Sequence, residues 1–232
     1  MARAGSLPKA EPLTPRGLDV AAAARLRAMI ITGRYAPGEH LVEEQLSEWL
    51  GVSRATVRGA FRLLHHEGLV EYRRNRGVFV LSFGAEDVWE VYTLRDALES
   101  RAAGLAAGRI GEAGRRQLET ILEAMRKAVA AGDRDAAMET DWQFHRAVME
   151  MSGHRRMQRI YAQLEAQTRM FLALSDTLHA DLGHMLPLHE PLAGAIAAGE
   201  VARAQELAGH HTESDGRALI RHLEERAVLA EQ

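Results

Sequence analysis

The chain has 232 residues, of which 47% are hydrophobic and 26% are charged, and its formal net charge at pH 7 is −3, a composition typical of a globular protein with two modest domains. It contains no cysteine, which excludes a disulfide framework and any zinc site with cysteine ligands. No apolar run approaches the roughly 20 residues that cross a bilayer, and no signal-peptide core is present, so we expect a cytoplasmic protein without a membrane partner.

The N-terminal region predicts an arm followed by one helix. Residues 1–17 hold three of the six prolines and show no hydrophobic periodicity, which predicts a mobile arm. Residues 18–32 carry an apolar stripe at helical spacing, formed by Ala22, Leu26, Met29 and Ile30. Gly33 follows this stripe and predicts the end of the helix.

Residues 41–80 predict two helices separated by a tight turn. The first helix has apolar residues at helical spacing, namely Leu41, Val42, Leu46, Trp49 and Leu50. Gly51 supplies the turn, and Ser53 caps the second helix. The second helix has a predicted buried face of Val57, Ala60, Phe61 and Leu64. Its other faces therefore carry a cationic set, which consists of Arg54, Arg58 and Arg62 with Thr56.

A basic hairpin follows the second helix. Two β-rich runs, 69–72 and 78–81, flank the sequence RRNRG at 73–77, which predicts a turn that tolerates positive φ. Residues 54–81 carry six arginines and two glutamates, whereas residues 82–232 hold 17 basic and 24 acidic side chains, a net charge of −7. Because the basic charge is concentrated on one helix and its hairpin, the segment predicts a winged helix-turn-helix that binds DNA; the alternative is an ordinary solvated face.

Several motifs in this region occur in a recognisable order, namely GRYAPGEHL at 33–41, LGVSR at 50–54, EGLV at 67–70 and NRGVFV at 75–80. Together they resemble the DNA-binding domain of the GntR family of bacterial transcription regulators. Two positions depart from the family pattern, because Ala55-Thr56 stands where Thr-Pro is usual and Gly59 replaces a usual glutamate. The resemblance implies a double-stranded operator DNA partner, and we assign its contacts to Ser53, Arg54, Thr56, Arg58, Arg76 and Gly77.

Beyond a linker at 82–85, strand signals nearly vanish. Six helices are predicted, at 86–109, 112–131, 133–151, 155–179, 188–198 and 201–226, with a tail at 227–232. Glycines punctuate them at 111, 132, 153 and 199. The predicted fold is therefore mainly α, with an N-terminal winged helix-turn-helix at 18–81 and an all-α six-helix bundle at 86–226.

Four ionisable residues lie on helix faces that should be apolar. Asp141 and His145 are one turn apart, and His189 and His211 each have apolar helical neighbours. By contrast, His210 shares its face with polar residues and should meet solvent. One carboxylate and three neutral imidazoles suit Zn²⁺ or Ni²⁺, with positions left open for water or a ligand oxygen. From the residues alone, hydrogen-bonded core histidines remain the alternative.

A second resemblance bears on these four residues. The motifs VYTLRDALE at 91–99, DWQFH at 141–145 and SGH at 152–154, followed by the histidines at 189 and 211, resemble the FCD effector domain of the FadR subfamily of GntR regulators. That resemblance implies a divalent metal held by Asp141, His145, His189 and His211. Pro191 is expected in a first helical turn, so the helix should begin near Leu188.

Arg95 is a candidate effector-binding residue. Its guanidinium could bind a small organic carboxylate in a bidentate way while the metal takes another oxygen. The alternative is an ion pair with Glu99, which lies one helical turn further along the same helix.

We therefore expect a homodimeric repressor, not an enzyme. The start of the second winged helix, with Arg54 and Arg58, should contact bases or phosphates, and Arg76 with Gly77 should enter the minor groove. A small organic acid at the metal should control operator affinity. Two alternatives remain: a regulator that senses the metal directly, and a metal-dependent hydrolase, for which the sequence offers no convincing general base.

Overall fold

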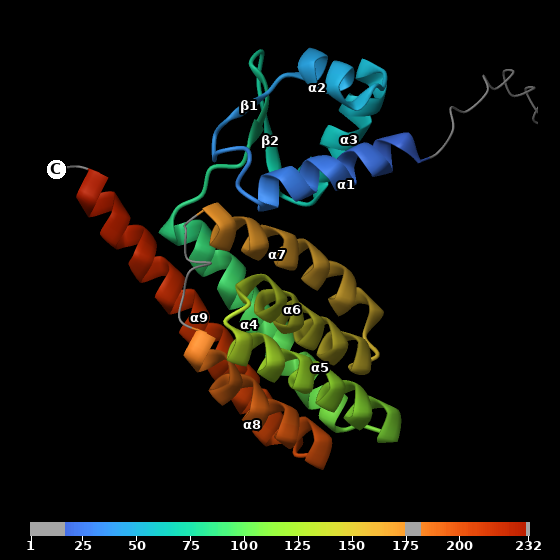
Figure 1. Ribbon diagram of the computed structural model, residues 1–232, viewed down its shortest axis with the longest axis vertical. Helices are drawn as coiled ribbons and strands as arrows, with labels where there is room; N and C mark the ends of the chain where they lie inside the picture. Colours follow the sequence, from blue (N-terminus) through green and yellow to red (C-terminus); the bar gives the residue numbers. More distant parts are fainter. Residues whose placement is uncertain (1–16, 175–181, 231–232) are drawn as a thin grey trace, which may run out of the picture.

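The computed structural model describes residues 17–174 and 182–230, and its fold in these ranges is mainly helical, as predicted (Figure 1). The predicted arm, except Gly17, lies outside the described residues. The same holds for positions 175–179 of the fourth bundle helix and for the end of the tail at 231–232. Within the described ranges, none of the helices has the length and apolar character needed for a membrane span.

The N-terminal part is a winged helix-turn-helix. Its helices are α1 (Leu18–Ile31), α2 (Glu43–Leu50) and α3 (Arg54–His66). Its three strands are β1 (His40–Leu41), β2 (Val70–Arg73) and β3 (Gly77–Val80). They form an antiparallel sheet in the order β1-β3-β2, with β2 and β3 making the wing. Asn75, at the tip of this hairpin, has a φ of 58°, so the predicted positive-φ turn is confirmed.

Three residues of the predicted first helix differ from the prediction. Leu41 pairs with Val78 in the sheet, and Val42 is the extended N-cap of α2, which begins at Glu43. Trp49 shares the helical spacing, but its side chain is 48% exposed, with the guanidinium of Arg25 5.1 Å from its ring centroid. In so short a segment, the spacing of apolar residues does not distinguish the buried face of a helix from a strand residue or an exposed aromatic side chain.

The predicted cap and buried face of α3 are confirmed. The backbone N–H of Thr56 donates to Ser53 Oγ at 3.1 Å, which satisfies one free donor at the helix start. The four residues of the predicted face are all buried: Val57, Ala60, Phe61 and Leu64. Gly59 has a packing reason, because a Cβ at this position would lie 2.9 Å from Asp19 Cβ on α1. Close approach of α1 therefore accounts for a residue that costs the helix about 1 kcal/mol in intrinsic propensity.

The C-terminal part is a helical bundle containing the six predicted helices. These are α4 (Ala85–Ala107), α5 (Glu112–Ala131), α6 (Arg134–Met151), α7 (Arg155–Leu174), α8 (Met185–Ala198) and α9 (Val201–Ala230). A short 3₁₀ helix, η2 (Leu182–His184), leads into α8. The long α9 runs beyond the predicted end at residue 226 and packs along α4 (Figure 1). Gly216 permits this contact, because a Cβ there would lie 2.9 Å from the Tyr92 side chain.

The predicted start of α8 near Leu188 is wrong. The helix begins three residues earlier, at Met185, so Pro191 lies inside it. Pro187 falls in the first turn, where no intrahelical N–H bond is needed. Pro191 lacks the N–H that would donate to the Pro187 carbonyl, so that helical hydrogen bond is lost. The rest of α8 holds His189 in a regular, buried turn.

The winged part packs directly on α7, as Figure 1 shows. The side-chain amide of Gln163 reaches the end of α3, with Nε2 3.2 Å from His66 Nε2. Gln167 covers Gly68, where an added Cβ would clash with the glutamine Nε2. One buried cluster runs from the winged core into the near end of the bundle, where Phe83 and Phe171 have ring centroids 4.4 Å apart. Helix α7 is therefore a bundle helix that contacts both α1 and the C-terminal end of α3.

Candidate metal centre

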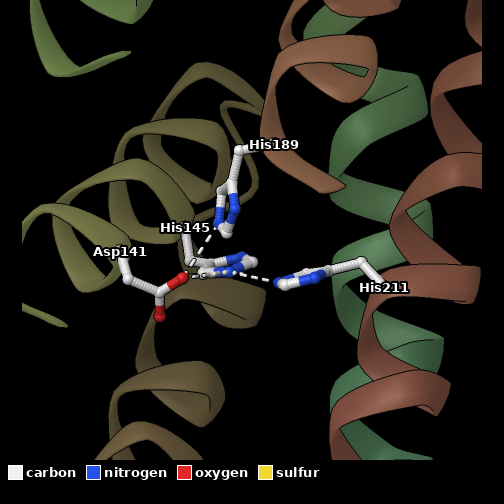
Figure 2. Close-up of side chains that lie close together, drawn as sticks. All are labelled: Asp141, His145, His189 and His211. Carbon is white, nitrogen blue, oxygen red and sulfur yellow. Dashed lines mark hydrogen bonds and ion pairs between the residues drawn. The ribbon is translucent and has the colours of Figure 1, made fainter. Parts of the chain in front are cut away.

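Four side chains from three helices converge inside the bundle (Figure 2). Asp141 and His145 come from α6, His189 from α8 and His211 from α9. One nitrogen or oxygen of each residue lies within 4.8 Å of all the others. The structure therefore brings together all four residues that the sequence nominated as ligands.

The closest approaches join atoms that normally accept protons or metals. Asp141 Oδ1 lies 2.9 Å from His189 Nε2 and 3.7 Å from His145 Nε2. His145 Nε2 lies 2.9 Å from His211 Nε2. The three imidazoles are buried, and the Asp141 side chain is only 13% exposed.

The Nδ1 atoms of His145 and His189 point away from the cluster, and their partners show that both carry a proton. His145 Nδ1 is 2.8 Å from Glu99 Oε2, and His189 Nδ1 is 2.8 Å from the Met185 carbonyl oxygen. Both partners can only accept, so both Nδ1 atoms must donate. In their neutral forms, which metal ligation requires, both rings would therefore direct the lone pairs of their Nε2 atoms toward the centre of the cluster.

This arrangement leaves polar atoms unsatisfied among the described residues. His189 Nε2 and His211 Nδ1 are buried and have no hydrogen-bond partner there, although a carboxylate oxygen faces His189 Nε2. Two acceptors that face each other at this distance repel unless a proton or a metal cation joins them. Outer N–H groups that donate to a carboxylate or a backbone carbonyl are also typical of metal-binding histidines. The donor set therefore fits a borderline divalent cation.

Electrostatics in the cluster favour a positive charge near His145. Burial lowers the pKa of His145, but the carboxylates of Glu99 and Asp141 outweigh burial and raise that pKa to about 10. Burial raises the pKa of Asp141, but the imidazoles of His145 and His189 hold it well below its usual range. Burial and the two neighbouring imidazoles hold the pKa of His211 well below its ordinary value, which keeps its ring neutral.

Arg95 lies beside the cluster and forms the intrahelical ion pair. It is buried, and its Nε donates to Glu99 Oε1 at 2.8 Å. Its guanidinium also lies 4.8 Å from the ring centroid of Tyr92 and 5.7 Å from that of Trp142. Glu99 therefore joins Arg95 to His145. In the sequence, Glu99 was predicted only as a possible ion-pair partner of Arg95. Its contact with His145 joins two different helices, so no local spacing in the sequence indicates it.

A small cavity of about 10 Å³ adjoins the cluster. Its lining includes Glu99, His145, Phe144 and Leu192. This is about the smallest space that holds one water. An organic ligand must therefore displace side chains to reach the cluster from this side.

The predicted DNA-binding residues occupy a separate surface on α3 and the wing. Arg54, Arg58, Arg76 and Gly77 are exposed, as is the cap Ser53, and Thr56 is half-buried. Two acidic residues at the start of α2 meet the recognition arginines: Glu44 contacts Arg54, and Glu43 lies 3.5 Å from Arg58. These exposed pairs contribute little stability, so they restrict the two arginines only weakly.

Sequence comparisons match both parts of the chain. The model of the bacterial regulatory proteins, gntR family, matches residues 18–80, and the FCD domain model matches residues 90–214. An uncharacterized HTH-type transcriptional regulator of Bacillus subtilis, YdhC, is 34% identical over 59% of this chain and 61% of its own length. The probable D-xylose utilization operon transcriptional repressor of Paenarthrobacter nicotinovorans is 29% identical over 78% of this chain and 80% of its own length.

A solved structure extends the similarity to the whole fold. A transcriptional regulator described as GntR from Rhodococcus sp. RHA1 superposes with a TM-score of 0.73 and is 28% identical. The superposition covers 87% of this chain and 97% of that one.

Proposed function

The chain belongs to the GntR family of bacterial transcriptional regulators and carries an FCD domain, and from this premise we propose that it is a repressor whose operator affinity is set by a divalent metal and a small carboxylate. The observation that carries the metal part is the inward-facing set of ring nitrogens beside Asp141. The repressor part is supported by the relative named for repression of a D-xylose utilization operon.

Operator binding is assigned to α3 and the wing. Arg54 and Arg58, at the start of α3, reach base edges or phosphates in the major groove. Arg76, next to Gly77 at the wing tip, reaches the adjacent minor groove. Two copies of the chain act as a homodimer, so the operator is near-palindromic, with half-sites about one helical turn of DNA apart.

The metal is assigned to Asp141, His145, His189 and His211, and Zn²⁺ and Ni²⁺ fit this donor set. When bound, the cation supplies a Lewis acid that takes an oxygen of a carboxylate ligand. Glu99 holds the His145 ring in the tautomer that exposes Nε2 to the cluster. Arg95 stands behind Glu99 and can recognise an anion that reaches this part of the bundle.

A ring of four charged residues connects the ligand-bearing helix to α7. Arg146 on α6 donates to Glu139 at 2.7 Å and to Glu165 at 3.1 Å. Arg169 on α7 donates to Glu165 at 3.0 Å and to Glu139 at 3.1 Å, and its guanidinium lies 4.9 Å from the ring centroid of Trp142. A shift of α6 that accompanies ligand binding is therefore carried to α7.

The other side of α7 meets the winged part through Gln163 and Gln167. A movement of α7 therefore changes the position of α3 relative to the bundle, and with it the spacing of the two recognition helices in a dimer. The coupling is allosteric only if metal or effector binds the DNA-competent and DNA-free arrangements with different affinities.

Direct sensing of the metal is a second candidate, and one observation favours it. Arg95 is buried and already paired with the Glu99 carboxylate. A guanidinium that has such a partner is less available to an organic acid.

The proposal is tested by measuring operator affinity by fluorescence anisotropy. Three samples are compared: chelator-treated protein, the same protein with Zn²⁺, and the same protein with Zn²⁺ and a panel of small organic acids. We expect operator affinity to differ by about 5- to 150-fold between at least two of these states. A response to Zn²⁺ alone identifies the metal as the signal. Identical operator affinity in all three samples, with Zn²⁺ bound, would contradict the proposal.

A further prediction concerns Glu99. Replacing Glu99 by glutamine removes the charge that orients His145, so the affinity for Zn²⁺ should fall by about 10- to 100-fold. The exposed Glu90 lies on the same helix, and Glu90→Gln is the matched control. Metal affinity is measured by competition with a chromophoric chelator, after circular dichroism has verified the fold of both variants. Equal affinities of the two variants would show that Glu99 has no role in the centre.

A further inference from the structure

Asp215 is a carboxylate beside the cluster that the four-ligand set leaves out. It follows His211 by one turn of α9, so both side chains project from the same face of that helix. Its Oδ2 lies 3.8 Å from His211 Nε2. The pair repeats, in reverse order, the Asp141-His145 pair on α6, which is also spaced by four residues.

The surroundings of Asp215 keep it partly buried beside the cluster. Its side chain is 31% exposed, so most of it is shielded from solvent. The neighbouring Gly216 packs against Tyr92 and fixes this turn of α9 against α4. By contrast, Glu213, on an outer face of the same helix, pairs with Arg217.

We propose that Asp215 binds the metal as a fifth protein ligand, which an effector carboxylate must displace. The proposal rests on the four-ligand centre described above. Asp215 Oδ2 faces His211 Nε2 at 3.8 Å, and a carboxylate oxygen suits the position that three nitrogens and one oxygen leave open. Two aspartates would neutralise the charge of a divalent cation.

Displacement of Asp215 has a mechanical consequence. While Asp215 and His211 both hold the metal, α9 is tied to α6 through two of its side chains. An incoming carboxylate takes the place of Asp215 and leaves α9 attached through His211 alone. The effector therefore loosens one helix instead of filling an empty position.

The test compares Asp215→Asn with Glu213→Gln, and with His211→Ala as a reference for a lost ligand. Asp215→Asn should bind Zn²⁺ at least tenfold more weakly than wild type, since changes of outer partners already cost 10- to 100-fold. Glu213→Gln should bind as wild type does. In the Co²⁺-loaded protein, Asp215→Asn should change the visible absorption bands, because an oxygen ligand is lost. A carboxylate that acted only through its charge would lower affinity without changing these bands.

Acetate provides the second readout. It should bind Zn²⁺-loaded Asp215→Asn more tightly than Zn²⁺-loaded wild type, because no internal carboxylate competes. Unchanged Zn²⁺ affinity or an unchanged Co²⁺ spectrum in Asp215→Asn, with weak binding in His211→Ala, would refute the fifth ligand and leave the four-ligand centre intact. Equally weak Zn²⁺ binding by wild type and His211→Ala would refute both the fifth ligand and the four-ligand centre.

Discussion

Replacing His211 by alanine should remove most of the divalent metal from the purified protein, whereas replacing the adjacent His210 should leave the metal content unchanged. His211 is buried with Nε2 at the centre of the cluster, and His210 is exposed. Loss of an outer partner of a metal ligand costs about 10- to 100-fold in affinity, so loss of a ligand itself should cost more than 100-fold. Elemental analysis of protein purified without chelators measures the effect.

The same pair of variants should separate in thermal stability. A metal that binds only the folded chain stabilises it by about 2.7 kcal/mol when its free concentration is 100 times Kd. Added Zn²⁺ should therefore raise the Tm of wild type and His210→Ala, and leave His211→Ala nearly unchanged. Equal metal content in His210→Ala and His211→Ala would indicate that the buried histidines are ordinary hydrogen-bonded core residues.

Part of this centre was accessible from the sequence and part was not. Asp141 and His145 share one turn of one helix, so their common direction follows from helical geometry alone. His189 and His211 lie on other helices, and only the family resemblance joined them to the pair. Glu99 contacts His145 across two helices at 2.8 Å, a relation that no local spacing encodes.

The fold shows the same division between local and long-range information. The predicted helix boundaries were good where a glycine marks the end, as at Gly132 and Gly199, which adopt left-handed conformations at C-caps. They failed at Leu41, where strand pairing decides, and at α8, where two prolines spaced by four residues share one helix. Polar side chains that join separate parts, such as Gln163 on α7, read as ordinary surface residues in the sequence.

Replacing Arg54 or Arg58 by alanine should weaken operator binding by about 1–3 kcal/mol without disturbing the fold. Both side chains are exposed at the start of α3 and are held by acidic residues of α2 that contribute little stability. Arg116→Ala is the control, because Arg116 is exposed in α5 and pairs with Glu112 in the same helix.

The salt dependence of operator binding separates the two roles open to each arginine. Loss of a phosphate contact should reduce the slope of log K against log salt by about 1 and weaken binding to all DNA sequences alike. Loss of a base contact should change this slope less than loss of a phosphate contact does. It should reduce the preference for operator over random DNA, because the discrimination lies in hydrogen bonds to one base pair. Fluorescence anisotropy at several salt concentrations, on operator and random duplexes, measures both quantities. An Arg54→Ala or Arg58→Ala variant that matches Arg116→Ala in affinity and in slope would remove that residue from the DNA interface.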